Sequence, residues 1–294
     1  MRLLSGALLT LVSVAILSAK LKPDVPPQDD ELRKALAFHA SFDGGTDAPR
    51  ASGDPKLYSA PSLKQRTEAK PGLPDSGEVA IAKGEGKFGD ALRFTAKKSP
   101  VVFFRGAGNV PFAASNWNGT VSFWLNVDPE GKLEPGFCDP IQITDSAWND
   151  AAFFVEFEKR TESIPFRLGV YADFAVWNPG NRKFEEIPAG EKPLVTVDKP
   201  PFRAGRWTHV VFTFEHFNTG RPDGVARLYL DGQPQGELRS RQQTFTWDLE
   251  KAVVAMGLGY IGLFDELAIF NRLLSAPEIQ SIHIMERGIS SLIR

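Results

Sequence analysis

The sequence predicts an all-β protein in which two antiparallel sheets pack face to face and one short helix follows near the C-terminus. Apolar and polar residues alternate with period two in many short segments, as they do in strands with one buried face. These segments recur roughly every 12–20 residues without long helical patterns between them, which excludes a sheet of alternating strands and helices. The chain also contains 26 Gly, 22 Pro and 22 Phe, a composition typical of aromatic strands joined by many turns.

The predicted strands begin soon after the N-terminal segment and continue almost to the C-terminus. In residues 119–131, Val121, Phe123 and Leu125 face one way and their neighbours face the other. Residues 43–76 are polar and rich in Gly and Pro, which indicates a long surface excursion. The remaining strands are expected at residues 35–42, 77–84, 90–96, 100–106, 139–145, 151–158, 165–173, 206–214, 225–231, 235–240 and 262–270.

The alternation also predicts which side chains are buried between the sheets. Phe123, Phe212, Leu228 and Ile269 all occupy the apolar face of their strands. The pair Asp-Gly at 231–232 favours a tight hairpin, because Gly tolerates the positive φ that such turns need. These strands are therefore expected to be neighbours in one sheet.

One helix is predicted near residues 275–286. Ser275 is a good N-cap, Pro277 suits the first turn, and Glu278 completes a Ser-x-x-Glu capping box. Ile279 and Ile282 then face the sandwich.

The first 34 residues are expected to lie outside the sandwich. Residues 1–19 carry one Arg and then an apolar run, which indicates a signal peptide or an uncleaved N-terminal anchor. Residues 20–34 form a Pro-rich linker, residues 35–287 the sandwich, and residues 288–294 a C-terminal tail. The domain is thus expected to be exported, to the periplasm, the cell surface or the medium, with membrane contact only through the N-terminal segment.

Charge and cysteine content exclude several classes of protein. The net charge of −2 is too weak to indicate a nucleic-acid partner. Cys138 is the single cysteine, so no intramolecular disulfide can form, and no His lies in a recognisable cysteine-protease context. We expect Cys138 to be buried and unreactive.

Five segments occur in an order that resembles a known family. They are "GKFGDALRF" (86–94), "TVSFWL" (120–125), "RWTHVVFTF" (206–214), "VARLYLDG" (225–232) and "GLFDELAIFNRLLSAPEI" (262–279). Together they resemble the laminin-G-like jelly roll of the concanavalin A-like lectin/glucanase superfamily, in a bacterial version. The resemblance implies a jelly-roll sandwich over residues 35–287. It does not fix the function, because this fold hosts lectins, adhesion modules, glycosidases and lyases.

The catalytic motifs of that superfamily are not matched. Its glycosidases carry two or three acids on one strand, and Glu156 and Glu158 do share a face. Arg160 and Thr161, however, occupy the places where the third acid is expected, so the pair is interpreted as part of a solvated strand edge. The signatures of alginate lyases are also absent, and no catalytic residue is assigned.

Two segments combine an aromatic ring with polar side chains, as sugar-binding sites usually do. Trp148 is followed by Asn149 and Asp150, and Trp177 is followed by Asn178, with Arg182 nearby. Both segments lie at strand ends or in loops, where binding residues concentrate. The alternative is that both Trp residues pack against the sandwich edge while the Asn side chains form turns. Trp124, Trp207 and Trp247 are expected mainly to pack.

The resemblance also implies a structural Ca²⁺, because members often hold one where the first strand ends near the last. The matching segments are "FDGG" (42–45) and "LFDE" (263–266). Asp43 and Asp265 are expected to offer carboxylates and Gly45 a carbonyl, which are ligands that Ca²⁺ prefers. The alternative is that Asp43 caps a turn and Asp265 forms an ion pair or a hydrogen bond to a backbone amide.

Three functions remain open at this point. The first is an exported noncatalytic carbohydrate-binding or cell-surface adhesion module, whose partner is a polysaccharide or glycan. The second is a divergent glycoside hydrolase or polysaccharide lyase. The third is a structural envelope protein held by protein contacts.

Overall fold

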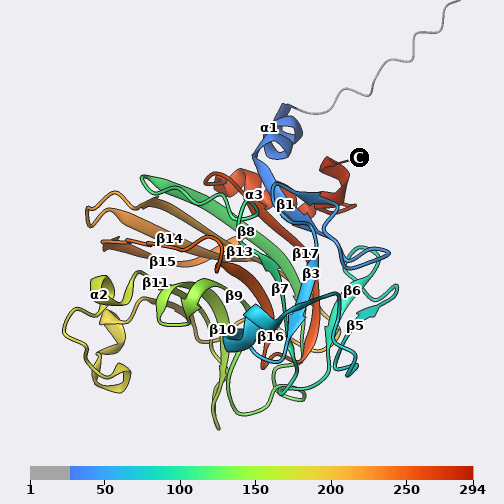
Figure 1. Ribbon diagram of the computed structural model, residues 1–294, viewed down its shortest axis with the longest axis horizontal. Helices are drawn as coiled ribbons and strands as arrows, with labels where there is room; N and C mark the ends of the chain where they lie inside the picture. Colours follow the sequence, from blue (N-terminus) through green and yellow to red (C-terminus); the bar gives the residue numbers. More distant parts are fainter. Residues whose placement is uncertain (1–26, 294) are drawn as a thin grey trace, which may run out of the picture.

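The computed structural model describes residues 27–293 and shows two antiparallel sheets packed face to face, with short helices around them (Figure 1). The predicted fold class is confirmed. The nine-stranded sheet has the order β15 (Gln233–Arg241), β14 (Gly224–Leu230), β13 (Trp207–Phe217), β8 (Trp117–Asn126), β17 (Gly262–Phe270), β1 (Leu36–Ala40) and β2 (Arg50–Ala51), and β6 (Ala91–Phe94) joins β17 and carries β5 (Val79–Ala82).

The eight-stranded sheet faces it across the core. Its order is β12 (Leu194–Val197), β11 (Phe166–Tyr171), β10 (Asp150–Lys159), β9 (Gly136–Ala147), β16 (Val253–Leu258), β7 (Val101–Arg105), β3 (Leu57–Ala60) and β4 (Lys70–Pro71). Residues 43–76, expected as a surface excursion, therefore contribute β2, β3 and β4, and β3 pairs with β7.

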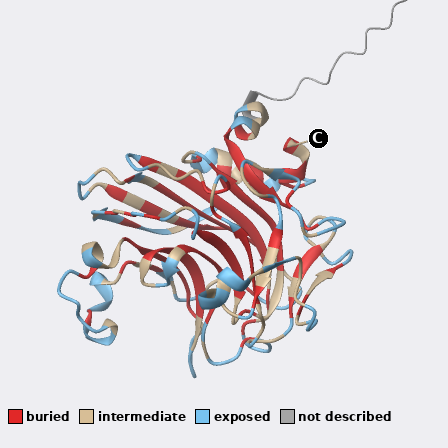
Figure 2. Ribbon diagram, viewed as in Figure 1, coloured by how far each residue is buried: buried red, intermediate tan, exposed pale blue. Residues whose placement is uncertain are grey.

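The core lies between the sheets and follows the predicted alternation. Phe123, Phe212, Leu228 and Ile269 all have 2% or less of their surface exposed and belong to one apolar cluster. Figure 2 shows that the buried residues follow the strands of both sheets, whereas the loops at the sandwich ends are exposed. The expected core residues are therefore confirmed.

A helical layer covers the outer face of the nine-stranded sheet. It consists of α1 (Pro27–Ala35), α3 (Ala276–Ile284) and the 3₁₀ helix η4 (Ile289–Leu292), which bury a second apolar cluster on β1, β13 and β17. Helix α3 has the predicted capping box between Ser275 and Glu278. Residues 27–34, assigned to a linker from the sequence, form helix α1, which buries Leu32 completely.

The outer face of the eight-stranded sheet is also largely covered. The 3₁₀ helix η1 (Leu63–Glu68) lies against it, and Arg66 donates from Nε to the Lys251 carbonyl at 3.2 Å. The segment with α2 (Phe174–Trp177), η2 (Phe184–Glu186) and η3 (Ala189–Glu191) lies near the end of β11 (Figure 1). The loops at the two ends of the sandwich and the margins of these covering segments therefore remain for binding surfaces.

The membrane-related predictions lie mostly outside this structure. The signal peptide or anchor at residues 1–19, and the linker up to residue 26, fall outside the described residues. Within residues 27–293, no helix is long and apolar enough to cross a membrane.

Candidate functional site

The loops at one end of the sandwich bring the predicted sugar-binding residues together. Strand β9 ends at Ala147, β10 begins at Asp150, and β11 ends at Tyr171, so these strand ends are neighbours in the sheet. Trp148 lies in the turn between β9 and β10 with 43% of its surface exposed. An indole in such a position is an exposed aromatic surface on a rigid scaffold.

The Trp148 ring is held in place by other aromatic rings. It makes edge-to-face contacts with Tyr171, at 5.6 Å between ring centroids, and with Phe184, at 5.5 Å. Tyr171 is fully buried and also contacts Trp177 at 4.9 Å. The cluster therefore fixes Trp148 without burying it.

Trp177, Asn149 and Asp150 are close to Trp148, but their polar atoms serve the loop itself. Trp177 Nε1 donates to the Asn149 carbonyl at 2.8 Å, and Asp150 Oδ1 accepts from the Phe174 amide at 2.7 Å. These hydrogen bonds dock α2 onto the turn that carries Trp148. They position the aromatic cluster.

Asn178 and Arg182 shape the following loop. Asn178 is only 3% exposed, and its side chain donates to the Arg182 carbonyl at 2.9 Å and accepts from the Arg182 amide at 3.0 Å. The Arg182 guanidinium forms an ion pair with Glu191 at 2.7 Å. Asn178 therefore fits the turn-forming alternative, while Arg182 remains on the surface.

A cavity of about 550 Å³ adjoins this cluster, and sequence reasoning did not find it. Asp173, which precedes α2, accepts hydrogen bonds from the Thr246 amide and hydroxyl, so the cavity wall and α2 are tied together. The cavity is lined by Phe112, Ala114, Asn218, Gly220, Gln242, Thr244, Phe245, Thr246 and Trp247. Its residues come from three loops far apart in sequence, so no local motif could have indicated it.

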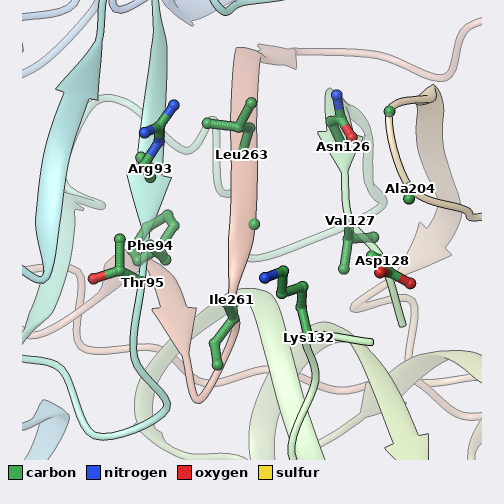
Figure 3. Close-up of a pocket in the computed structure, with 12 residues that line it drawn as sticks. Arg93, Phe94, Thr95, Asn126, Val127, Asp128, Lys132, Ala204, Ile261 and Leu263 are labelled. Atoms are coloured by element: carbon green, nitrogen blue, oxygen red, sulfur yellow. The ribbon is translucent and has the colours of Figure 1, made fainter. Parts of the chain in front are cut away.

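Another cavity, of about 460 Å³, lies at the other end of β8. Figure 3 shows Arg93 and Asn126 on strands on either side of Leu263, with Lys132 and Asp128 on the loop that follows β8. Arg93 is paired with Glu85, and Asp128 Oδ1 accepts from the Gly131 amide at 3.1 Å. No exposed aromatic ring like Trp148 projects among the residues that line this cavity.

The two carboxylates that were compared with a glycosidase pair are held by one guanidinium. Arg167 contacts Glu156 at 2.5 Å and Glu158 at 2.8 Å. Burial raises the pKa of Glu156, although Arg167 opposes the shift. The interpretation of a solvated strand edge is wrong for Glu156, because β10 lies between β9 and β11 and Glu156 is only 7% exposed.

Asp43 and Asp265 both contact the loop at residues 84–90. Asp43 Oδ1 accepts from the Asp90 amide at 2.8 Å, and Asp265 Oδ2 accepts from the Phe88 amide at 3.1 Å. Burial, together with the charges of Glu266 and Asp43, raises the pKa of Asp265 to about 8. In the part of the chain that the structure describes, no group of three His, Cys, Asp or Glu side chains is placed to hold a metal.

The lone cysteine has the expected environment. Cys138 is free and 3% exposed, and burial raises the pKa of its thiol to about 12. A thiol with so little thiolate is a poor nucleophile.

The fold and the end loops define a lectin-like β-sandwich, and comparison with known proteins agrees. Residues 104–280 match the model of the concanavalin A-like lectin/glucanases superfamily, and the chain belongs to this superfamily. No curated protein matches the chain.

Solved structures share the fold at low sequence identity. One is domain 4 of an extracellular arabinanase from Geobacillus stearothermophilus, in complex with arabinotriose; identity is 16%, the TM-score is 0.52, and the match covers 84% of this chain and 97% of that one. Another is the ligand-binding domain of botulinum neurotoxin serotype D in complex with N-acetylneuraminic acid. Its identity with this chain is 13%, the TM-score is 0.54, and the match covers 87% of this chain and 52% of the toxin domain. This chain thus spans about half the length of the toxin domain.

Proposed function

We propose that this protein is an exported, noncatalytic carbohydrate-binding module that binds polysaccharide through the loops around Trp148. The proposal is supported by the superfamily and by two structural neighbours whose complexes contain sugars, arabinotriose and N-acetylneuraminic acid. Because those neighbours share 16% and 13% identity with this chain, they support the class of ligand and not a particular sugar.

The observation that carries the proposal is the exposed, rigidly held indole of Trp148. The apolar face of a sugar ring can pack on an aromatic side chain, and the surrounding polar groups then bind its hydroxyls. The adjoining cavity supplies such groups, since Gln242, Thr244 and Thr246 line it. The site thus combines the two kinds of surface that a polysaccharide needs.

The test compares two exposed aromatic residues. Trp148→Ala should abolish retention on polysaccharide columns, or weaken binding of a soluble oligosaccharide by about tenfold, which corresponds to about 1.4 kcal/mol. Phe137→Ala is the matched control, because Phe137 is 54% exposed but lies near the opposite end of β9. The probes are arabinan, arabinotriose, and a panel of other plant and bacterial polysaccharides.

The outcomes separate the open functions. Loss of retention in Trp148→Ala but not in Phe137→Ala, with unchanged melting temperatures, supports the module. Equal retention by both variants would contradict the Trp148 site. Release of reducing sugars by the wild-type protein would instead show a hydrolase, which the ion-paired state of Glu156 and Glu158 disfavours.

We also propose a structural Ca²⁺ beside Asp43 and Asp265. Burial and the neighbouring charges of Glu266 and Asp43 raise the proton affinity of Asp265, and a hard cation beside these carboxylates would stabilise the charged form of Asp265. Gly86 and Gly89 allow the 84–90 loop to lie against them, because an added Cβ would come within 2.9 Å of Asp265 Oδ2 and 2.2 Å of Asp43 Oδ1. Gly45 remains the expected source of a carbonyl ligand.

The calcium test is thermal unfolding with saturating Ca²⁺ and with excess chelator. A cation that binds only the folded protein should raise the melting temperature of the wild type, and Asp265→Asn should lose this response. Asp47→Asn is the control, since Asp47 is exposed and its only ion-pair partner among the described residues is Lys56 at 3.8 Å. Identical curves with calcium and with chelator for the wild type would contradict the calcium site.

A further inference from the structure

A third cavity, of about 450 Å³, lies on the outer face of the nine-stranded sheet, beyond the end of α3. Five segments meet there: the 84–90 loop, strand β8, the beginning of β13, the turn at Asp231, and residues 283–286. Its lining consists of Lys87, Phe88, Trp124, Arg206, Trp207, Asp231, His283, Ile284, Met285 and Glu286. This cavity is separate from Trp148. Trp207, in the cavity lining, is the first residue of β13. Phe217, the last residue of β13, pairs with Trp117 at the other end of the sandwich.

Lys87 brings a positive charge to this cavity without a neutralising partner. Its Nζ lies 4.6 Å from the centre of the Trp124 ring and 5.4 Å from that of Phe88. Among the ion pairs of the described residues, none involves Lys87, although its loop neighbour Glu85 is paired with Arg93. A cation–π contact holds an ammonium group in place and leaves its charge available to an anion.

The aromatic ring available to a ligand is Trp207. Trp124 is only 4% exposed and is already stacked on His209, with 4.6 Å between the ring centres. Trp207 points to the same outer face, two residues before His209 on β13, and is half-buried. It was expected mainly to pack, yet it lines the cavity and makes none of the aromatic contacts found among the described residues.

The cavity lining contains one other cation, Arg206, and two carboxylates, Asp231 and Glu286. Arg206 is bound to Asp231, at 2.5 Å, and is therefore neutralised within the protein. Glu286 is exposed at the rim. Burial lowers the pKa of His283, and so do the nearby cations Lys87 and Arg206, whereas Asp231 raises it; the ring is therefore neutral at pH 7. Its Nδ1 has no hydrogen-bond partner among the described residues. Lys87 is thus the cation of the cavity that forms none of the ion pairs found among the described residues, and Glu286, at the rim, is a carboxylate that forms none of them either.

We propose that this cavity binds a carboxylated sugar residue, a uronate, whose ring packs on Trp207 and whose carboxylate contacts Lys87. A flat aromatic side chain suits the apolar face of a sugar ring, and an ammonium group without a partner suits a carboxylate. The exposed side chain of Ile284 and that of Met285 extend the apolar wall beside the ring. The site is independent of the one proposed around Trp148 and does not depend on it.

The test uses oligogalacturonate and its methyl ester, which differ at the carboxyl group alone: it is a charged carboxylate in the acid and a neutral methyl ester in the other probe. Binding is measured by titration calorimetry in low salt and in the presence of chelator, so that no calcium ion can bridge to the carboxylate. The wild type should bind the acid at least about tenfold more tightly than the ester, since a hydrogen bond to a charged group is typically worth that factor. Added salt should weaken this binding.

Four variants assign the contacts. Lys87→Met should remove the preference for the acid. Lys83→Met should retain it, because Lys83 is an exposed lysine directly before the 84–90 loop and does not line the cavity. Trp207→Ala should weaken both probes, and Trp148→Ala should change neither. Melting temperatures within a few degrees of wild type confirm that each variant is folded.

A pH series adds a second readout. A bound carboxylate favours the imidazolium form of His283, so the wild type should bind the acid more tightly as the pH falls from 7 toward 5, and His283→Gln should lack this rise. The titratable or charged groups that face His283 are His209, Lys87, Arg206, Asp231 and Glu286.

Three outcomes would overturn the proposal. One is equal affinity for acid and ester in the wild type. Another is a Lys87→Met variant that keeps the preference. The last is binding that disappears in chelator, which would place the carboxylate on a metal ion and not on Lys87.

Discussion

Replacement of Phe212 by Ala is the most direct test of how the two sheets face each other. Phe212 lies in the middle of β13, opposite Val121 of β8 and Leu228 of β14, with 1% of its surface exposed. Across the core, its ring stacks on Phe153 of the eight-stranded sheet, with 6.0 Å between centroids and an interplanar angle of 17°. The substitution therefore removes a contact between the sheets.

The expected cost follows from this burial. A buried Phe removes roughly 150–250 Å² from water, and at about 25 cal/mol per Å² this is worth about 4–6 kcal/mol before the area of the remaining Ala is subtracted. Measured Phe→Ala substitutions in cores cost about 3–5 kcal/mol, which we expect here. For a domain of this size, that corresponds to a fall in melting temperature of roughly 6–20 °C.

The assay is urea unfolding followed by fluorescence and circular dichroism, with the wild-type slope retained. Phe137→Ala is the control; because Phe137 is 54% exposed, its loss should cost less than about 1 kcal/mol. A Phe212→Ala variant as stable as the wild type would mean that the inward and outward faces of β13 are exchanged, since a one-residue slip reverses every side chain.

Three further predictions concern single groups. Glu278 should stabilise the protein at neutral pH, because its pKa is lowered to about 2, mainly by its hydrogen bond with Arg272. In urea unfolding at pH 7, Glu278→Gln should lower the free energy of unfolding by about 1–2 kcal/mol. This difference between the variant and the wild type should vanish as the pH falls from about 4 to 2. Gly169→Ala should destabilise by about 1–3 kcal/mol, because the new Cβ would lie 2.2 Å from the Phe154 ring; an unchanged denaturation midpoint would contradict this packing. Cys138 should react with a thiol reagent only as fast as the protein unfolds, because burial raises its pKa to about 12; rapid reaction of the folded protein would refute its burial.

The sandwich and its C-terminal helix could be predicted from local sequence patterns. Strands with one buried face carry a period-two pattern, and the Ser275–Glu278 capping box is a signal contained in four residues. Phe123 and Phe212 could therefore be placed in the core, because the direction of a side chain follows from its place in the strand.

Elements stabilised by distant contacts were not predictable in this way. Strand β16 shows no alternation of apolar and polar residues, because residues 253–257 are buried on both faces of the sheet. One face belongs to the main core, and the other lies under η1. Helix α1 has a charged sequence that reads as a linker, and it is held by the burial of Leu32 and by the Arg33 hydrogen bond to Leu292, 259 positions away. Such contacts become visible only when the chain is folded.

The candidate sites show the same difference between local sequence signals and distant contacts. The Trp-Asn pairs at 148–149 and 177–178 could be found in the sequence, but only the tertiary structure distinguishes Trp148, which is exposed, from Asn178, whose amide is buried in its own turn. Lys87, Trp207 and His283 carry no shared motif. They meet because strand pairing and the packing of α3 on the sheet bring together residues nearly 200 positions apart. A sequence pattern depends only on residues that are close along the chain, so it could not indicate this cavity.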